Sequence, residues 1–267
     1  MRKPPFRKMS LAIGLALLIQ ALLLQVFIGT SALAGEKQIT AVTEPWPPYM
    51  GPRLIDNGFL PEILVEAFDQ VGYTVTVEFR PWARSLNDVK KGDKDILCGA
   101  YYTQEREEFL AYSQPIAEVQ DVLFMKKGRN ITYQQLTDLK PYKIGVVRGA
   151  AHGKEFDAAD FLNKEEVTHS GQNIRKLLVD KIDLMAGPKD VIEFIIQRDY
   201  PLFVDKIVAV NPPLSTNKIY FGFSKKVAGY QELLKAFSKG LTLIKKDGSY
   251  DYLAEKHDIE VFKLVGN

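Results

Sequence analysis

Short strand patterns alternate with helical patterns along nearly the whole chain after residue 37. Residues 38–43, 73–79 and 95–100 have strand patterns, and apolar residues at helical spacing lie between them. This alternation is typical of sheets covered by helices, so it predicts an α/β protein. In such proteins the loops after the strands commonly carry the ligand contacts.

A polar segment divides this alternation into two parts. Residues 126–130, KKGRN, follow a further predicted strand at 119–125, and the strand and helix patterns then restart. Further strands are predicted at 207–210 and at 218–223, the second returning the chain to its first part. A composition shift of this kind suggests a crossing between domains. We therefore predict two lobes, lobe 1 from residues 37–125 plus 220–267 and lobe 2 from residues 126–219.

The first 34 residues have the pattern of a secretory signal peptide. A basic start precedes an apolar run from Leu11 to Ile28, and residues 31–34, SALA, offer a small-residue cleavage motif. We expect cleavage after Ala34 and a location in the periplasm. The alternative is an uncleaved membrane anchor, because the apolar run is long enough to span a bilayer.

Charge and cysteine content narrow the classes of function. Without residues 1–34, the 35 basic residues fall to 31 against 33 acidic residues. That balance gives no case for nucleic acid or an anionic membrane as a partner. The single cysteine, Cys98, lies in an apolar strand and is expected in the core. The three histidines match no zinc spacing. We therefore expect no disulfide, no metal and no cofactor.

The stretch GDKDILCGAYYTQEREEFLAYSQP, residues 92–115, is the strongest candidate for a ligand site. A buried strand at 95–100 leads into a turn, and Thr103 is placed to cap the helix that follows. Arg106, one turn into that helix, is a planar donor that matches a carboxylate. Strand end, helix N-terminus and arginine together predict a site for an acidic small molecule. The alternative is a surface arginine that pairs with a neighbouring glutamate.

This stretch resembles the bacterial extracellular solute-binding proteins that capture polar amino acids for ABC importers. The pattern Gly-x-x-Asp-x-x-x-x-x-x-x-Thr-x-x-Arg, followed by Ser-x-Pro, carries the resemblance, and further pieces match in order after about residue 37. The resemblance implies a two-lobed, type II periplasmic-binding-protein-like fold with two crossover hinge strands and a ligand in the cleft between the lobes. It also implies that Arg106 holds the ligand's α-carboxylate, and that a monomer delivers the ligand to an inner-membrane ABC permease.

A proline-rich loop after the first strand supplies further candidates. Residues 44–49, EPWPPY, are a poor match to helix or central strand because of their three prolines. The resemblance implies that Trp46 lies over the ligand and that Glu44 lines the site. The alternative for Trp46 and Tyr49 is that they cover the domain core.

Two more turns complete the predicted site. Trp82 and Arg84 follow the second strand, and Arg148, Gly149 and Ala150 form a small-residue turn at which a ligand can approach backbone N–H groups. For the two arginines the alternative is a solvated rim position. The predicted ligand-binding residues are Glu44, Trp46, Trp82, Arg84, Tyr101, Thr103, Arg106, Arg148, Gly149 and Ala150.

One position departs from the family pattern. Amino-acid binders carry an aspartate for the α-ammonium where this chain has Gly187 and Pro188. An unpaired buried ammonium is costly, so an amino-acid ligand requires a substitute partner, for which Glu44 and Asp190 are candidates. Tyr101 also replaces a small hydroxyl residue and would crowd or stack on the ligand. We therefore expect a ligand with at least one carboxylate plus a flat or cationic portion.

The sequence thus predicts a periplasmic binding protein, not an enzyme, that captures a carboxylate-bearing, amino-acid-like solute for an ABC importer. One alternative is a dehydratase of a prephenate-like cyclic acid on the same fold, with Glu44 or His152 as the acid or base. The other is a periplasmic sensor module that works through a separate signalling protein.

Overall fold

The structure is a computed structural model that describes residues 37–259. The chain divides into two units, residues 1–37 and 38–267. Apart from Lys37, the strands and helices described below lie in the second unit. The predicted signal peptide lies outside the described residues. None of the helices between residues 37 and 259 combines the length and hydropathy that a membrane span requires.

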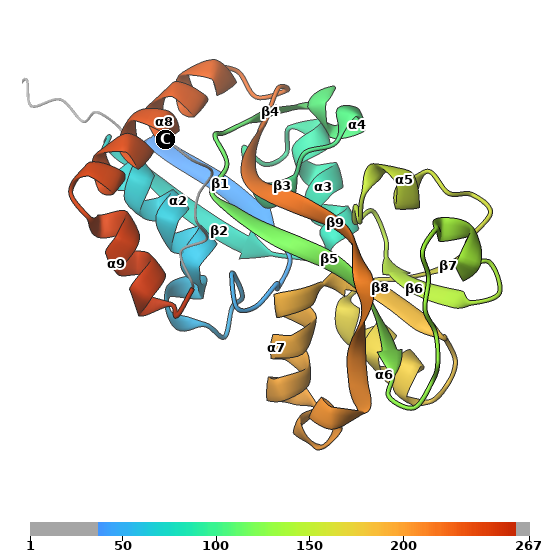
Figure 1. Ribbon diagram of the computed structural model, residues 1–267. Coiled ribbons are helices and arrows are strands. Elements are labelled where there is room, and N and C mark those ends of the chain that lie inside the picture. The colour runs from blue at the N-terminus through green and yellow to red at the C-terminus, as the bar shows by residue number, and fades with distance from the viewer. Residues whose placement is uncertain (1–36, 260–267) are drawn as a thin grey trace, which may run out of the picture. The chain divides into compact units, whose positions relative to one another are not determined.

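The strands of the described region form one mixed sheet (Figure 1). Their spatial order is β2–β1–β3–β9–β5–β8–β6–β7, and β4 pairs with β9 outside this path. The strands are β1 (Lys37–Thr43), β2 (Tyr73–Phe79), β3 (Ile96–Tyr101), β4 (Leu110–Tyr112), β5 (Ala117–Lys126), β6 (Lys143–Val147), β7 (Asn163–Val167), β8 (Leu184–Pro188) and β9 (Ile207–Ser224).

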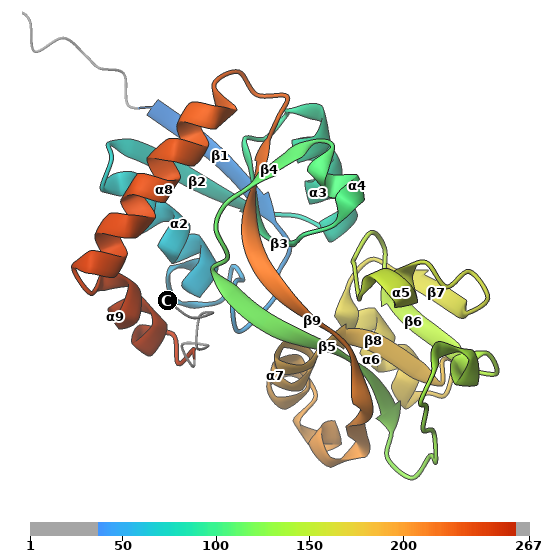
Figure 2. The same ribbon diagram turned by 45° about the horizontal axis from the view of Figure 1, so that its top comes forward.

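Two long strands, β5 and β9, connect the half of the sheet that contains β1–β4 with the half that contains β6–β8 (Figure 2). They pair antiparallel from Ala117 opposite Ile219 to Lys126 opposite Ile207, with one irregularity in register. The end of β9 also pairs with β3 and β4, and the end of β5 pairs with β8. The two strands predicted at 207–210 and 218–223 are therefore parts of one strand. The residue limits of the two lobes stay a prediction.

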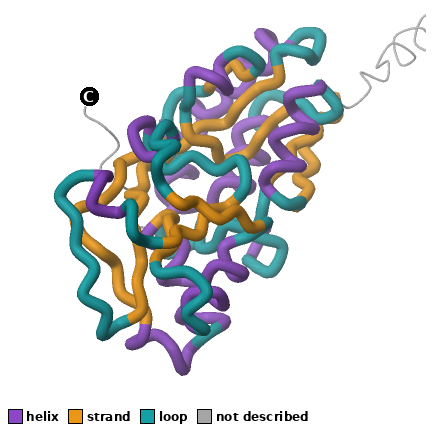
Figure 3. The backbone as a smooth tube through the Cα atoms, turned by 90° about the vertical axis from the view of Figure 1, so that its right-hand side faces the viewer, coloured by secondary structure: helices purple, strands orange, loops and turns teal. Residues whose placement is uncertain are grey.

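Helices cover both faces of the sheet (Figure 3). Because successive strand residues point to opposite faces, Ile96 and Cys98 pack with α2 and α8, while Leu97 packs with α3 on the other face. The predicted core position of Cys98 is thus confirmed. The helices are α2 (Phe59–Asp69), α3 (Trp82–Lys91), α4 (Gln104–Glu107), α5 (Lys154–Asp157), α6 (Ser170–Leu178), α7 (Lys189–Asp199), α8 (Tyr230–Lys246) and α9 (Ser249–Lys256), with short 3-10 helices η1 (Ile55–Asn57), η2 (Leu136–Leu139) and η3 (Pro201–Lys206).

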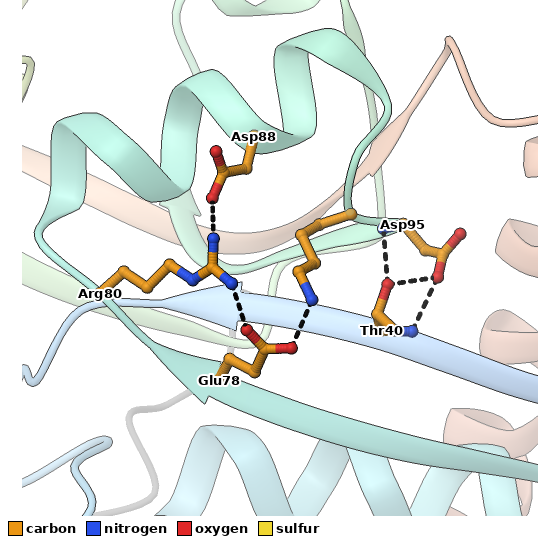
Figure 4. Close-up of polar contacts among 6 residues, drawn as sticks. Thr40, Glu78, Arg80, Asp88 and Asp95 are labelled. Atoms are coloured by element: carbon orange, nitrogen blue, oxygen red, sulfur yellow. Dashed lines mark hydrogen bonds and ion pairs between the residues drawn. The ribbon is translucent and has the colours of Figure 1, made fainter.

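Polar contacts tie β1, β2 and α3 together (Figure 4). Arg80, at the end of β2, donates to Glu78 and to Asp88 of α3, each over 2.6 Å. Asp95 accepts hydrogen bonds of 2.7 Å from both the backbone N and the Oγ1 of Thr40. Part-exposed ion pairs of this kind contribute little stability. The Arg80 contacts join the end of β2 to α3, whose first residue, Trp82, lies at the site described below.

Gly240 of α8 lies against the backbone of α2. A Cβ atom at this position would come within 1.7 Å of the Ala67 carbonyl oxygen. Gly240→Ala is therefore expected to force the two helices apart and to lower the free energy of unfolding by about 1–3 kcal/mol, a fall of several degrees in melting temperature. Lys239→Ala, which changes the exposed neighbouring residue, is the control and should leave the melting temperature nearly unchanged. Equal melting temperatures for the two variants would contradict this packing.

Candidate functional site

A cavity of about 50 Å³ lies where the loops of the two halves of the sheet meet. It can hold a few waters or part of a small ligand in this closed arrangement. Its walls combine aromatic rings, two acids, one arginine and one histidine. The lining residues are Glu44, Trp46, Met50, Trp82, Gly99, Tyr101, Arg106, Asp121, Val147, Ala150, Ala151, His152, Ser170, Ala186, Gly187 and Pro188.

Arg106 is a buried cation in this cavity, with 5% of its surface exposed. Thr103 caps α4 by accepting a hydrogen bond from the Arg106 backbone N over 3.2 Å, as the sequence predicted. The guanidinium donates to the carbonyl oxygens of Tyr101 (3.0 Å) and Gly149 (2.9 Å) and lies 5.2 Å from the centre of the Trp82 ring. Burial lowers the pKa of Arg106 from its usual value. No carboxylate among the described residues bonds this guanidinium.

Gly149 joins the second half of the sheet to this arginine. Its φ of +74° lies in the left-handed region that favours glycine. Its carbonyl oxygen accepts from Arg106 and also from the Trp82 indole N–H, over 2.8 Å. Tyr49 makes another connection, because its hydroxyl donates to Asp190 of α7 over 3.0 Å. These hydrogen bonds therefore join segments that are far apart in the chain.

Glu44 and Trp46 line the cavity from the proline-rich loop. Burial raises the pKa of Glu44 to about 8, although the positive charge of Arg106 opposes this shift. The Trp46 ring packs against Tyr49 and Tyr101, with centroids 5.0 and 6.2 Å apart. Trp46 therefore presents an aromatic wall beside an acid that is largely protonated at neutral pH.

Asp121 and His152 form a second polar centre that the sequence analysis did not place in the site. Asp121 is fully buried on β5. Its Oδ1 lies 2.8 Å from His152 Nδ1, and its Oδ2 accepts a hydrogen bond from Asn217 Nδ2 over 3.1 Å. Ser215 on β9 donates to the His152 carbonyl oxygen over 2.7 Å, which holds the histidine in place. The available signal was an aspartate directly before the apolar run VLFM of β5.

Two buried polar atoms at the cavity have no hydrogen-bond partner among the described residues. They are His152 Nε2 and the Tyr101 hydroxyl oxygen. Asp121 lies near enough to Tyr101 to raise the pKa of that hydroxyl further, beyond the larger effect of burial. Unsatisfied buried polar groups are uncommon in native proteins and mark places where a ligand can bind.

The structure brings most of the predicted site residues together. Glu44, Trp46, Trp82, Tyr101, Arg106 and Ala150 line the cavity, and Thr103 and Gly149 lie in the larger groove beside it.

Two predicted arginines lie outside the cavity. Arg84 is exposed because α3 turns Trp82 and Ser85 inward instead. Arg148 is exposed and donates to Glu166 over 2.8 Å. Asp190 also does not line it. No group of three or more histidine, cysteine, aspartate or glutamate side chains within residues 37–259 is arranged to hold a metal ion.

Two curated proteins are similar to this chain in sequence. A probable histidine-binding protein of Neisseria gonorrhoeae is 22% identical over 202 residues, 73% of this chain and 72% of that protein. A probable histidine-binding protein of Campylobacter jejuni is 26% identical over 183 residues, 64% of this chain and 65% of that protein.

Solved structures with the same fold cover most of the chain. A mutant of ArgBP from T. maritima has a TM-score of 0.72 at 18% identity, over 86% of this chain and 99% of its own. A histidine kinase sensor domain similar to periplasmic binding proteins also has a TM-score of 0.72, at 20% identity, over 83% of this chain and 96% of its own. The predicted type II periplasmic-binding-protein fold is thus confirmed. The model of the bacterial extracellular solute-binding proteins, family 3, matches residues 39–259, and the chain belongs to that family.

Proposed function

We propose that this protein captures a small amino-acid-like solute with a carboxylate and delivers it to an ABC importer. The ligand binds in the cavity between two lobes, residues 37–125 plus 220–267 and residues 126–219, which close around it by bending of β5 and β9. The export signal at residues 1–34 directs the chain to the periplasm, where a monomer meets the inner-membrane permease.

The observation that carries this proposal is the buried guanidinium of Arg106, which bonds only backbone carbonyl oxygens within the described residues. Charge-assisted, two-pronged bonds to a carboxylate are the strong interactions available to such a group. Trp82 stacks on one side of it, and Trp46 adds a second aromatic wall. The names of the two bacterial relatives, both probable histidine-binding proteins, agree with an amino-acid ligand that has a flat or cationic side chain.

A thermal-shift screen tests the proposal. The panel contains L-histidine, L-arginine, L-phenylalanine and L-glutamine, together with acids that lack the amino group and amines that lack the carboxylate. A compound at about 100 times its dissociation constant adds about 2.7 kcal/mol of stability, which raises the melting temperature by several degrees. We expect shifts only from compounds with a carboxylate, larger for histidine or arginine than for glutamine. A panel in which no carboxylate raises the melting temperature would contradict the proposal.

The dehydratase of a prephenate-like cyclic acid is the second candidate, favoured by one observation. A pKa near 8 suits Glu44 to donate or accept a proton at neutral pH. Proton NMR of prephenate with the purified protein distinguishes the two functions. We expect the prephenate signals to persist, and their conversion to the dehydrated, decarboxylated product would establish the enzyme instead.

A further inference from the structure

We propose that Asp121 and His152 together bind the α-ammonium group of the ligand, so that the ligand is a zwitterion. This inference rests on the proposed function and adds the second half of the recognition site. It supplies a partner for the ammonium in place of the aspartate that is absent at Gly187–Pro188.

The first argument is the charge distribution of the cavity. Arg106 donates to two backbone carbonyls, while the Asp121 carboxylate bonds His152 and Asn217 and lies near the Tyr101 hydroxyl. No bond joins Arg106 to Asp121. Both side chains are at least 95% buried, and a buried charge is costly unless an opposite charge meets it. A zwitterion supplies both opposite charges at once, its carboxylate at Arg106 and its ammonium at Asp121.

The second argument is the position of Asp121 in the sheet. Asp121 on β5 is directly opposite Pro188 on β8 in the antiparallel pairing. Residues directly opposite each other on such strands point to the same face of the sheet. Asp121 therefore points to the same face of the sheet as Pro188, one of the two residues that stand where the resemblance implies an ammonium-binding aspartate. The acid is carried by the neighbouring strand in this chain.

The third argument is the unpaired nitrogen of His152. A carboxylate only accepts hydrogen bonds, so the 2.8 Å contact places the proton of a neutral imidazole on Nδ1 and leaves the lone pair on Nε2. Nε2 is buried at the cavity and has no partner among the described residues. It can accept one N–H of an ammonium group while Asp121 supplies the negative charge. The bond to Asp121 fixes the ring orientation that this requires.

Calorimetric titration of matched ligand pairs tests the inference. The pairs are L-histidine with 3-(imidazol-4-yl)propionate, L-arginine with 5-guanidinopentanoate, and L-phenylalanine with 3-phenylpropionate. In the wild-type protein we expect the amino acid of the best-binding pair to bind at least about tenfold more tightly than its partner. Asp121→Asn should remove this preference by weakening only the amino acid, and His152→Gln should reduce it.

Asp205→Asn is the control, since Asp205 is exposed and does not line the cavity. It should keep the full preference for the amino acid. Equal affinities for both members of each pair in the wild-type protein would overturn the ammonium subsite and leave the proposed function standing. Absence of binding by any of the six carboxylates would overturn the proposed function itself. If Asp121→Asn does not fold, His152→Gln decides, because the full preference in that variant would overturn the assignment to this pair.

Discussion

Arg106→Met is expected to weaken binding of the best ligand of the panel by about tenfold to several-thousandfold. The guanidinium supplies the only cationic group that lines the cavity within the described residues. Its removal leaves the ligand's carboxylate buried without a partner, which costs about 2–5 kcal/mol. In the ligand-free protein we expect little loss of melting temperature, because methionine replaces a desolvated charge with an apolar chain of similar length. Calorimetry and thermal melts measure both quantities.

Arg84→Met is the matched control for this experiment. Arg84 is the other arginine predicted for the site, yet it is exposed on α3 and does not line the cavity. Its replacement should change the dissociation constant by less than about twofold, since rim charges mainly affect the rate of association. If Arg106→Met bound as tightly as the control, Arg106 would not be the carboxylate anchor.

Glu44→Gln is expected to stabilise the ligand-free protein at alkaline pH and to have little effect at pH 4. Burial raises the pKa of Glu44 from 4.5 to about 8, so the folded state keeps a proton that the unfolded chain loses in this range. The folded state then binds more protons than the unfolded state, and wild-type stability falls as pH rises from about 4.5 to 8. Above that range both states are ionised and the loss levels off. The shift corresponds to at most about 5 kcal/mol.

Urea denaturation of wild type and variant across pH 4–9 measures this effect. Glutamine keeps the size and polarity of the side chain but has no proton to lose, so the difference in unfolding free energy should grow with pH and then become constant. Glu255→Gln, at an exposed position of α9, is the control and should show no such growth. A difference between Glu44→Gln and wild type that is the same at pH 5 and pH 9 would contradict the raised pKa of Glu44.

Much of the fold could be predicted from the sequence because elements with one buried face carry apolar residues at a regular spacing. The α8 helix extends over Tyr230–Lys246, and its apolar residues at helical spacing predict it directly. The strand β7 was not predicted, because Asn163–Val167 is an edge strand with one buried residue and so lacks an apolar run. The single strand β9 was predicted as two strands, since its central residues, NPPLS, contain two prolines and the first three of them are exposed.

Site residues that lie close together in the sequence were predicted. The site residue that reaches the cavity through pairing between distant strands was missed. Thr103 and Arg106 are three residues apart in one turn, so their relation can be read from the chain. Asp121 enters the cavity through the pairing of β5 with β8 and β9, and that register depends on an irregularity which follows Asp121. The exposed position of Arg84 follows from the helical phase of α3, which would have been available from the spacing of Trp82 and Ser85.

The assignment of Arg106 as the carboxylate anchor is tested most directly by a crystal structure of the protein with the panel compound that raises its melting temperature most. We expect both carboxylate oxygens of that compound within about 3 Å of the Arg106 guanidinium, inside the cavity lined by Trp46 and Trp82. A compound bound elsewhere, or bound in this cavity with its carboxylate directed away from Arg106, would contradict the assignment.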